Sequence, residues 1–223
     1  MRIVPLAVGL VFCLTSLRAD TLPSILARMD KAAPDFHGLT ANIVMDTYQK
    51  ILDSHTPESG SLRMQRTPKG DVRAIIEFKG ADNARTIAFQ GKIIRIYYPN
   101  LNTYQDVSLG ADAAVVNQYL LLGFGSSGKE LAQNYTITDE GSDKIAGQAA
   151  TKLLLVPKDS KIAQRVAKVE IWVPDNGTNP IQQKFYDPSG NYRLVTYSDI
   201  QLNPPMKGVL EFKLPKNAHR QTQ

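Results

Sequence analysis

The segment Gly123–Lys129 contains the residue types that can bind a phosphate group. Its glycines satisfy the GxGxxG pattern, and Lys129 completes the first seven places of the GxxxxGK loop. A phosphate loop then needs Ser or Thr to bind magnesium, whereas this chain has Glu130. Both motifs also require a preceding strand of a parallel βαβ unit, and here the flanking residues have helical patterns. We therefore interpret the segment as a flexible connection between two helices.

Residues for metal binding or nucleophilic catalysis are few. The three histidines, His37, His55 and His219, are far apart, and the only cysteine is Cys13. No pair has the spacing of metal ligands, and neither a GxSxG nor an HExxH motif occurs. Two carboxylates could still meet in space, as they do in glycosidases. Without a nucleophile motif or a metal set, we expect a protein that is not an enzyme and that needs no cofactor or metal.

Arg66 is a more informative residue because of its place in a strand pattern. Leu62, Met64 and Arg66 point to the same side of a strand, so one guanidinium projects from an apolar face. Burying an unpaired arginine is costly, so the group must find hydrogen-bond acceptors or lie at the rim of a cavity. Carbonyl groups of overlying helices would be suitable acceptors, and a ligand could break such a latch. The alternative is a strand-end arginine whose charged head reaches water.

Residues 1–19 have the architecture of a signal peptide that is removed on export. Arg2 precedes an apolar run, Ile3–Leu17, and Ala19 is the small residue before the cleavage point. Bacterial lipoprotein signals have a small residue before the modified cysteine, whereas Phe12 precedes Cys13 here. We expect a soluble, unlipidated protein of the periplasm.

The composition excludes several classes of protein. Of the 223 residues, 43% are hydrophobic and 21% are charged, which is typical of a globular domain and not of a disordered, collagen-like or polytopic membrane protein. The net charge of +5 falls to +3 once Arg2 and Arg18 leave with the signal. This charge is too small and too dispersed to predict a nucleic-acid partner. No linker or repeat divides residues 20–223, so we expect a single domain.

The hydrophobic periodicity predicts two or three helices. Apolar residues from Leu22 to Ala33 follow the spacing of one helix face, with Thr21 as a candidate cap and Pro34 at the end. A second helix is predicted at Ala111–Leu122, and a short third one at Lys129–Asn134.

The rest of the chain has the period of two that is typical of half-buried strands. Turn residues separate about eleven such segments at hairpin spacing. The candidates include Gly60–Thr67, Arg85–Gln90, Thr103–Ser108, Tyr135–Glu140, Gln148–Val156, Ala167–Val173, Pro180–Tyr186 and Asn191–Ile200. An antiparallel sheet of this size should curl, with the helices over its mouth. The interior is then either a packed core or a cup for an apolar ligand.

Five short segments, taken in their order along the chain, resemble the LolA-like family of periplasmic lipoprotein carriers. They are Gly60–Arg66 with Pro68, Gln90–Pro99, Leu155–Lys158, Asp187–Gly190 and Phe212–Pro215. The resemblance covers nearly all of residues 20–223. It implies a mainly β protein with helices (α+β), an incomplete antiparallel β-barrel of about 11 strands covered by a lid of two or three helices. It also places Arg66 where the carriers have an arginine that hydrogen-bonds to the lid.

The strand pattern, the predicted helices and the family resemblance together predict a site made of a cavity wall and a lid. The cavity wall is expected from Ile43, Met45, Leu62, Met64, Ile76, Phe78, Phe89, Ile94 and Ile96. The lid is expected from Leu22, Ile25, Leu26, Met29, Leu120, Leu121 and Phe124, with Arg66 as its latch. Strand alternation places Ile76 toward the cavity and Ile75 on the surface.

The expected function is a periplasmic carrier that shields lipoprotein acyl chains and moves them from the inner to the outer membrane. Its partners would be acylated lipoproteins or another lipid, a transient inner-membrane release complex and an outer-membrane acceptor, and the carrier would be a monomer. One alternative is a binding protein for another amphiphile, such as a glycolipid or an isoprenoid. Another is a half-barrel sensor of envelope stress.

Overall fold

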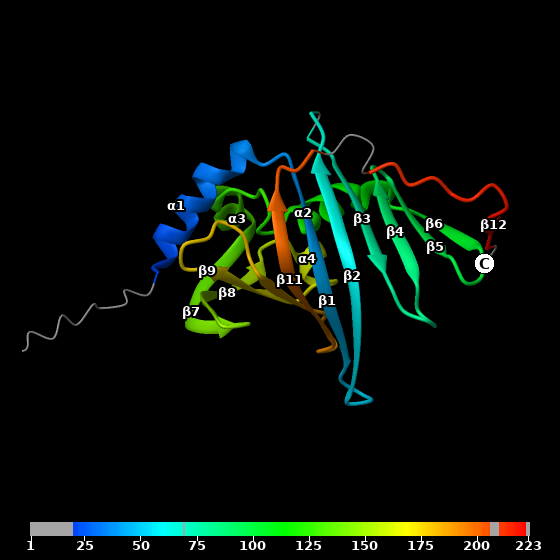
Figure 1. Cartoon of the computed structure of the whole chain (residues 1–223). Coiled ribbons are helices and arrows are strands. Elements are labelled where there is room, and N and C mark those ends of the chain that lie inside the picture. Colours follow the sequence, from blue (N-terminus) through cyan, green and yellow to red (C-terminus); the bar gives the residue numbers. More distant parts are fainter. Residues whose placement is uncertain (1–19, 69, 206–209, 222–223) are drawn as a thin grey trace, which may run out of the picture.

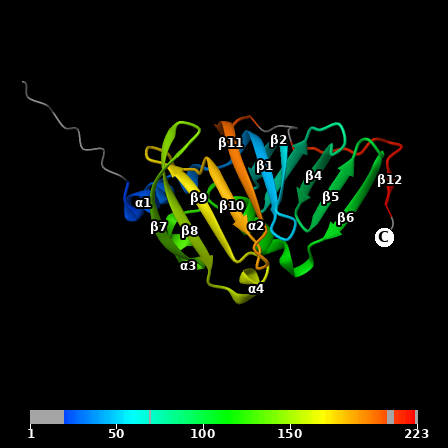
Figure 2. The same cartoon turned by 90° about the horizontal axis from the view of Figure 1, so that it is seen from below.

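We analysed a computed structural model of the chain, which describes residues 20–68, 70–205 and 210–221. The predicted signal peptide, residues 1–19, lies outside the described residues, as does Cys13. The fold is mainly β, with one large sheet and a set of helices that lie against one of its faces (Figures 1 and 2).

One curled sheet contains all twelve strands of the described chain, in the order β12-β6-β5-β4-β3-β2-β1-β11-β10-β9-β8-β7. Neighbouring strands are antiparallel except β12, which pairs in parallel with β6. The strands are β1 (Gly38–Gln49), β2 (Ser54–Arg66), β3 (Val72–Phe78), β4 (Arg85–Gln90), β5 (Ile93–Tyr98), β6 (Thr103–Ser108), β7 (Tyr135–Ile145), β8 (Gln148–Pro157), β9 (Lys168–Pro174), β10 (Gln182–Tyr186), β11 (Tyr192–Leu202) and β12 (His219–Arg220). Because β12 and β7 form opposite edges, the barrel is incomplete, as predicted.

Three α-helices occupy the positions that periodicity indicates: α1 (Leu22–Ala32), α2 (Ala113–Leu121) and α3 (Gly128–Asn134). The structure also has the short helices η1 (Ala33–Asp35), η2 (Gly110–Asp112) and α4 (Ser160–Ala163). Pro23 lies in the first turn of α1, where its missing N–H costs nothing, but the side chain of Thr21 makes no capping hydrogen bond. A capping box formed by Ser127 and Glu130 starts α3. None of the helices in the described ranges is long and apolar enough to cross a membrane.

Four features differ from the elements that the sequence predicts. Strand β7 ends at Ile145 rather than at Glu140, because its hairpin with β8 continues past a register shift between Asp139 and Ser142. Strand β2 begins at Ser54 rather than at Gly60, because its polar first half continues the hairpin with β1 down to the pair Gln49 and Ser54. The short helix α4 was not predicted; Asp159 caps it by accepting hydrogen bonds from two backbone amides. The two-residue strand β12 was also missed, since so short a segment has no periodicity to detect.

Two apolar clusters lie on the concave face of the sheet, which we define as the face that α1, α2 and α3 cover. One cluster joins α1 and α3 to the strands β7–β9. The other joins Phe36, which follows η1, together with α2 and the turn after α2, to β1–β4 and β11. In Figure 2 the sheet arches over α2 and α3, so the helices fill part of the curl.

The opposite, convex face of β3 and β4 is also covered. Ile75 and Ala88 pair across these strands and pack against Leu210, with Phe212 beside them. Ile75 is only 3% exposed, so its predicted surface position is wrong. Strand alternation correctly directs it away from the concave face, but it does not show that the C-terminal segment returns to cover it.

Candidate functional site

The concave face of β2–β5 carries two continuous apolar rows, each formed by paired residues on four neighbouring strands. The two rows consist of Leu62, Ile76, Ile87 and Ile96, and of Met64, Ala74, Phe89 and Ile94. The period of two aims every member of a row to the same side of the sheet. The structure therefore brings together six of the nine predicted wall residues in these rows, with a seventh, Phe78, beside them. Ile43 and Met45 extend the surface on β1.

The apolar face changes from packed to open across the strands. Leu62 and Met64 on β2 are buried, and Ile76 on β3 is half-buried. Ile94 and Ile96 on β5 are half-buried and belong to neither of the two concave-face clusters. On β6, Val107 is paired with Ile94 of the neighbouring strand and is 43% exposed. The face is thus a packed core near β1 and β2 and an exposed apolar surface toward β6.

A charged pair lies on the same face at the end remote from the lid. Glu58 and Arg85 flank β3, and the guanidinium of Arg85 lies 4.2 Å from the centroid of the Phe78 ring. Both nitrogens of its fork donate to the Glu58 carboxylate. This bidentate pairing holds the pKa of Glu58 below its ordinary value. The apolar rows therefore end at a satisfied ion pair.

The predicted lid residues divide between two places. Leu120, Leu121 and Phe124, from α2 and the turn that follows, pack against the predicted wall. The α1 residues Leu22, Ile25, Leu26 and Met29 pack instead in the other cluster. Sequence reasoning missed the strand residues that they cover, which are Leu153, Leu155, Val169, Ile171 and Val173. Alternation in β8 and β9 was the available signal, but it does not assign a helix to a strand.

Arg66 connects the two parts of this lid. Its Nη1 donates to the carbonyl oxygen of Ala33, at the end of α1, over 3.3 Å. Its Nη2 donates to the carbonyl oxygen of Gly125, after α2, over 2.6 Å. The guanidinium also lies 5.7 Å from the centroid of the Phe36 ring. The carbonyl of Ala33 also accepts a hydrogen bond from the backbone amide of Phe36, whereas Gly125 lies in the turn after α2. A cavity of about 180 Å³ lies beside these contacts, lined in part by Ala33, Phe36 and Gly125.

The glycine-rich turn between α2 and α3 is packed closely, in contrast to the flexible connection that the sequence suggested. Gly125 has φ +75°, and a Cβ there would overlap the ring of Phe36. A Cβ on Gly128 would likewise overlap the backbone of Leu26. The glycines therefore allow close approach of the chain, and no phosphate-binding role is needed to explain them.

A second polar contact holds the same turn from the sheet and was missed by sequence reasoning. Gln183 on β10 is 2% exposed, and its Nε2 donates to the carbonyl oxygen of Leu122 over 2.7 Å. Its Oε1 accepts a hydrogen bond of 2.6 Å from the hydroxyl of Tyr197. Burial raises the pKa of Tyr197 well above its ordinary value, so this hydroxyl stays a donor. A buried glutamine in a short strand has no sequence signature.

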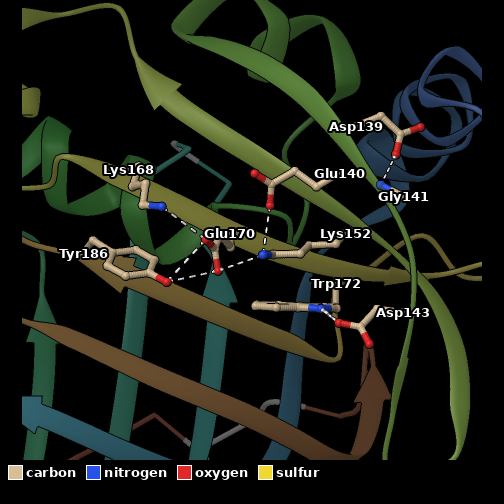
Figure 3. Close-up of polar contacts among 9 residues, drawn as sticks. All are labelled: Asp139, Glu140, Gly141, Asp143, Lys152, Lys168, Glu170, Trp172 and Tyr186. Atoms are coloured by element: carbon tan, nitrogen blue, oxygen red, sulfur yellow. Dashed lines mark hydrogen bonds and ion pairs between the residues drawn. The ribbon is translucent and has the colours of Figure 1, made fainter. Parts of the chain in front are cut away.

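The convex face of β7–β10 carries a network of charges with mutual partners (Figure 3). Glu170 is 5% exposed and contacts the ammonium groups of Lys152 and Lys168, each over 3.3 Å. The hydroxyl of Tyr186 also donates to it. Within the described ranges, no group of three or more His, Cys, Asp or Glu side chains is arranged to hold a metal ion. These carboxylates are occupied by neighbouring cations and donors.

Comparisons with known proteins identify the fold. No protein-family model and no curated protein match the chain. LprF from Mycobacterium bovis aligns with a TM-score of 0.50 and 15% identity, over 90% of this chain and 99% of LprF. MucB aligns with a TM-score of 0.51 and 13% identity, over 86% of this chain but only 62% of MucB.

A LolA superfamily protein from Nitrosomonas europaea aligns with a TM-score of 0.40 and 16% identity, over 87% of this chain and 99% of that protein. At such identities the likeness concerns the fold alone. The fold is shared with LprF and MucB, and the strand order and helices confirm the predicted open barrel with a helical lid.

Proposed function

We propose that this chain is a periplasmic carrier that shields acyl chains on the concave face of its open barrel. The observation that carries the proposal is the half-buried apolar surface of β3–β5 beside a lid held by Arg66. Each methylene group removed from water contributes about 0.8 kcal/mol, so a surface of this kind binds lipid without directed polar contacts. The unlipidated signal predicted at residues 1–19 supports a periplasmic location.

The lid makes binding reversible. Opening it breaks the two hydrogen bonds of Arg66, and the ligand must offset this cost. The net affinity is therefore lower than the buried apolar area alone would give, which favours release. This property suits a carrier that receives acylated lipoproteins from an inner-membrane release complex and passes them, as a monomer, to an outer-membrane acceptor. The chain has no enzymatic activity in this proposal.

Lipid extraction and mass spectrometry of the protein purified from its own periplasm test the proposal. We expect diacylglyceryl-modified peptides in the extract. A free glycolipid or isoprenoid would support a binding protein for another amphiphile instead. An extract without bound lipid would contradict both roles.

A sensor of envelope stress is the second candidate, and the likeness of the fold to MucB favours considering it. The chain matches 62% of the length of MucB, so any activity of that whole protein is here only a hypothesis. A transfer assay separates the two roles. A carrier moves lipid from donor to acceptor vesicles catalytically, whereas a sensor binds lipid without increasing the transfer rate.

A further inference from the structure

A small cavity lies within the lid, between α2 and α3, apart from the apolar rows of the sheet. Its volume is about 170 Å³, which is room for several water molecules or a small polar group. Leu121, Leu122 and Leu131 supply an apolar part of its lining. Gln118 and Tyr135 supply polar groups from the two sides, one from α2 and the other from the residue after α3.

Two hydrogen-bond donors in this lining have no partner among the described residues. Tyr135 is 2% exposed, and its hydroxyl is buried without a hydrogen bond. The Nε2 of Gln118 is likewise buried and unpaired. Such groups are rare in folded proteins because each loses its bonds to water on burial. The hydroxyl of Tyr119 on the same helix is a third unpaired group. Burial raises the pKa of Tyr135 to about 12, so this hydroxyl remains a donor at neutral pH.

The other polar side chains of the lining, Ser126, Glu130 and Asn134, each make a hydrogen bond. Ser126 Oγ donates to the carbonyl oxygen of Leu121 over 2.6 Å. Glu130 Oε2 accepts from the backbone of Ser127, and Asn134 Nδ2 donates to the carbonyl oxygen of Glu130. The buried side-chain atoms of the lining that lack a partner, Gln118 Nε2 and the Tyr135 hydroxyl, can both donate. The lining contains a carboxylate but no cationic side chain. This chemistry favours an uncharged acceptor over a phosphate or a free carboxylate.

We infer that this cavity binds the ester or amide carbonyl of the acyl cargo, with Tyr135 and Gln118 donating to its oxygen. The inference rests on the proposed carrier function and adds a polar determinant to it. A carbonyl oxygen has two lone pairs, which matches the two unpaired donors. Leu121 belongs to this lining and also packs against the apolar cluster over the sheet, so the two sites adjoin at this residue. The acyl chain would follow the apolar surface while its linkage lies in the lid.

Equilibrium binding of a monoacylglycerol and of the alkyl ether of glycerol with the same chain tests this assignment. The two ligands differ in the carbonyl, which the ether lacks. We expect the wild-type protein to bind the ester about tenfold more tightly, as two net hydrogen bonds allow. In Tyr135→Phe and Gln118→Leu, ester affinity should fall toward that of the ether, while ether affinity stays unchanged.

Tyr48→Phe is the matched control, since it removes a hydroxyl that bonds to Asp53 in an exposed hairpin. Its ester-to-ether ratio should equal that of the wild type. Urea unfolding without lipid checks the fold, and the midpoint of Tyr135→Phe should equal or exceed that of the wild type because the hydroxyl is unpaired. A lower midpoint would indicate a partner within the free protein and overturn the inference.

The outcomes separate the inference from the function on which it rests. If the wild type binds neither ligand, the proposed carrier function fails. If it binds both ligands equally, or if Tyr135→Phe keeps the preference for the ester, the carrier function stands and the carbonyl site is refuted.

Discussion

Arg66 on β2 donates a hydrogen bond of 2.6 Å to the carbonyl oxygen of Gly125, in the turn between α2 and α3. The same guanidinium donates to Ala33 at the end of α1, so one side chain holds two separate parts of the lid. These parts belong to different apolar clusters of the sheet. Movement of either part away from the barrel therefore requires a change at Arg66.

We predict that Arg66→Leu retains the fold, raises lipid affinity by up to about tenfold and slows handover to an acceptor. The lid of this variant opens at lower cost, so less of the binding free energy is offset. Vesicle-to-vesicle transfer rates and equilibrium lipid binding measure the two effects. Arg63→Leu is the control, because Arg63 pairs with Glu77 on the convex face over 2.9 Å. Wild-type transfer in Arg66→Leu would contradict the latch.

A charge introduced into the open part of the concave face should reduce lipid binding selectively. Ile76→Glu places a carboxylate among the apolar rows, where an acyl chain would have to desolvate it. Val44→Glu is the matched control, since Val44 is 49% exposed. We expect at least a tenfold loss of affinity in Ile76→Glu and none in Val44→Glu. Equal effects in the two variants would refute the assigned face.

The buried position of Ile75 makes a different prediction. Ile75→Glu places a charge between Ala88 and Leu210, beside its cross-strand partner Arg63, which already pairs with Glu77. The free energy of unfolding should fall by about 3 kcal/mol or more. Urea unfolding measures this loss, and a variant as stable as the wild type would show that the C-terminal segment does not cover this position.

The buried contact between Tyr197 and Gln183 should contribute to stability. Tyr197→Phe leaves the Oε1 of Gln183 without a donor, which costs about 1–3 kcal/mol of unfolding free energy. Tyr48→Phe removes an exposed hydrogen bond and should change the stability by less than about 0.5 kcal/mol. Urea unfolding of both variants gives the comparison, and losses of the same size would contradict a special role for the buried pair.

Acid should destabilise the barrel through two arginine–carboxylate pairs. Arg85 lowers the pKa of Glu58, and Arg95 lowers the pKa of Asp106, from ordinary values of 4.5 and 3.8. The stabilisation is therefore complete above the ordinary values and is lost as the pH falls through the lowered ones.

Urea unfolding between about pH 5 and about pH 2 measures this loss. The double variant Arg85→Met with Glu58→Gln should lose less stability over that range, by up to about 1 kcal/mol. The double variant Arg95→Met with Asp106→Asn tests the pair of Arg95 and Asp106 in the same way. A pH profile identical to that of the wild type in both variants would contradict the contribution of these pairs.

Local patterns in the sequence predict most of the elements. Alternation along β3 and β4 gives the correct faces for Ile76 and Phe89, because the period of two is a property of the strand itself. The same parity places Arg66 on the apolar side of β2. The spacing of Leu22, Ile25 and Met29 identifies α1, because a helix repeats its face every three or four residues.

Local patterns therefore set the period and direction of each segment. The surfaces that meet are visible only in the folded chain: α1 covers β7–β9, Leu210 and Phe212 bury Ile75, and Arg66 reaches Gly125. The unpaired hydroxyl of Tyr135 in the lid cavity is likewise visible only there. The physical reason is that such contacts join residues far apart along the chain, and the free energy of packing that selects them depends on shapes that no local repeat records.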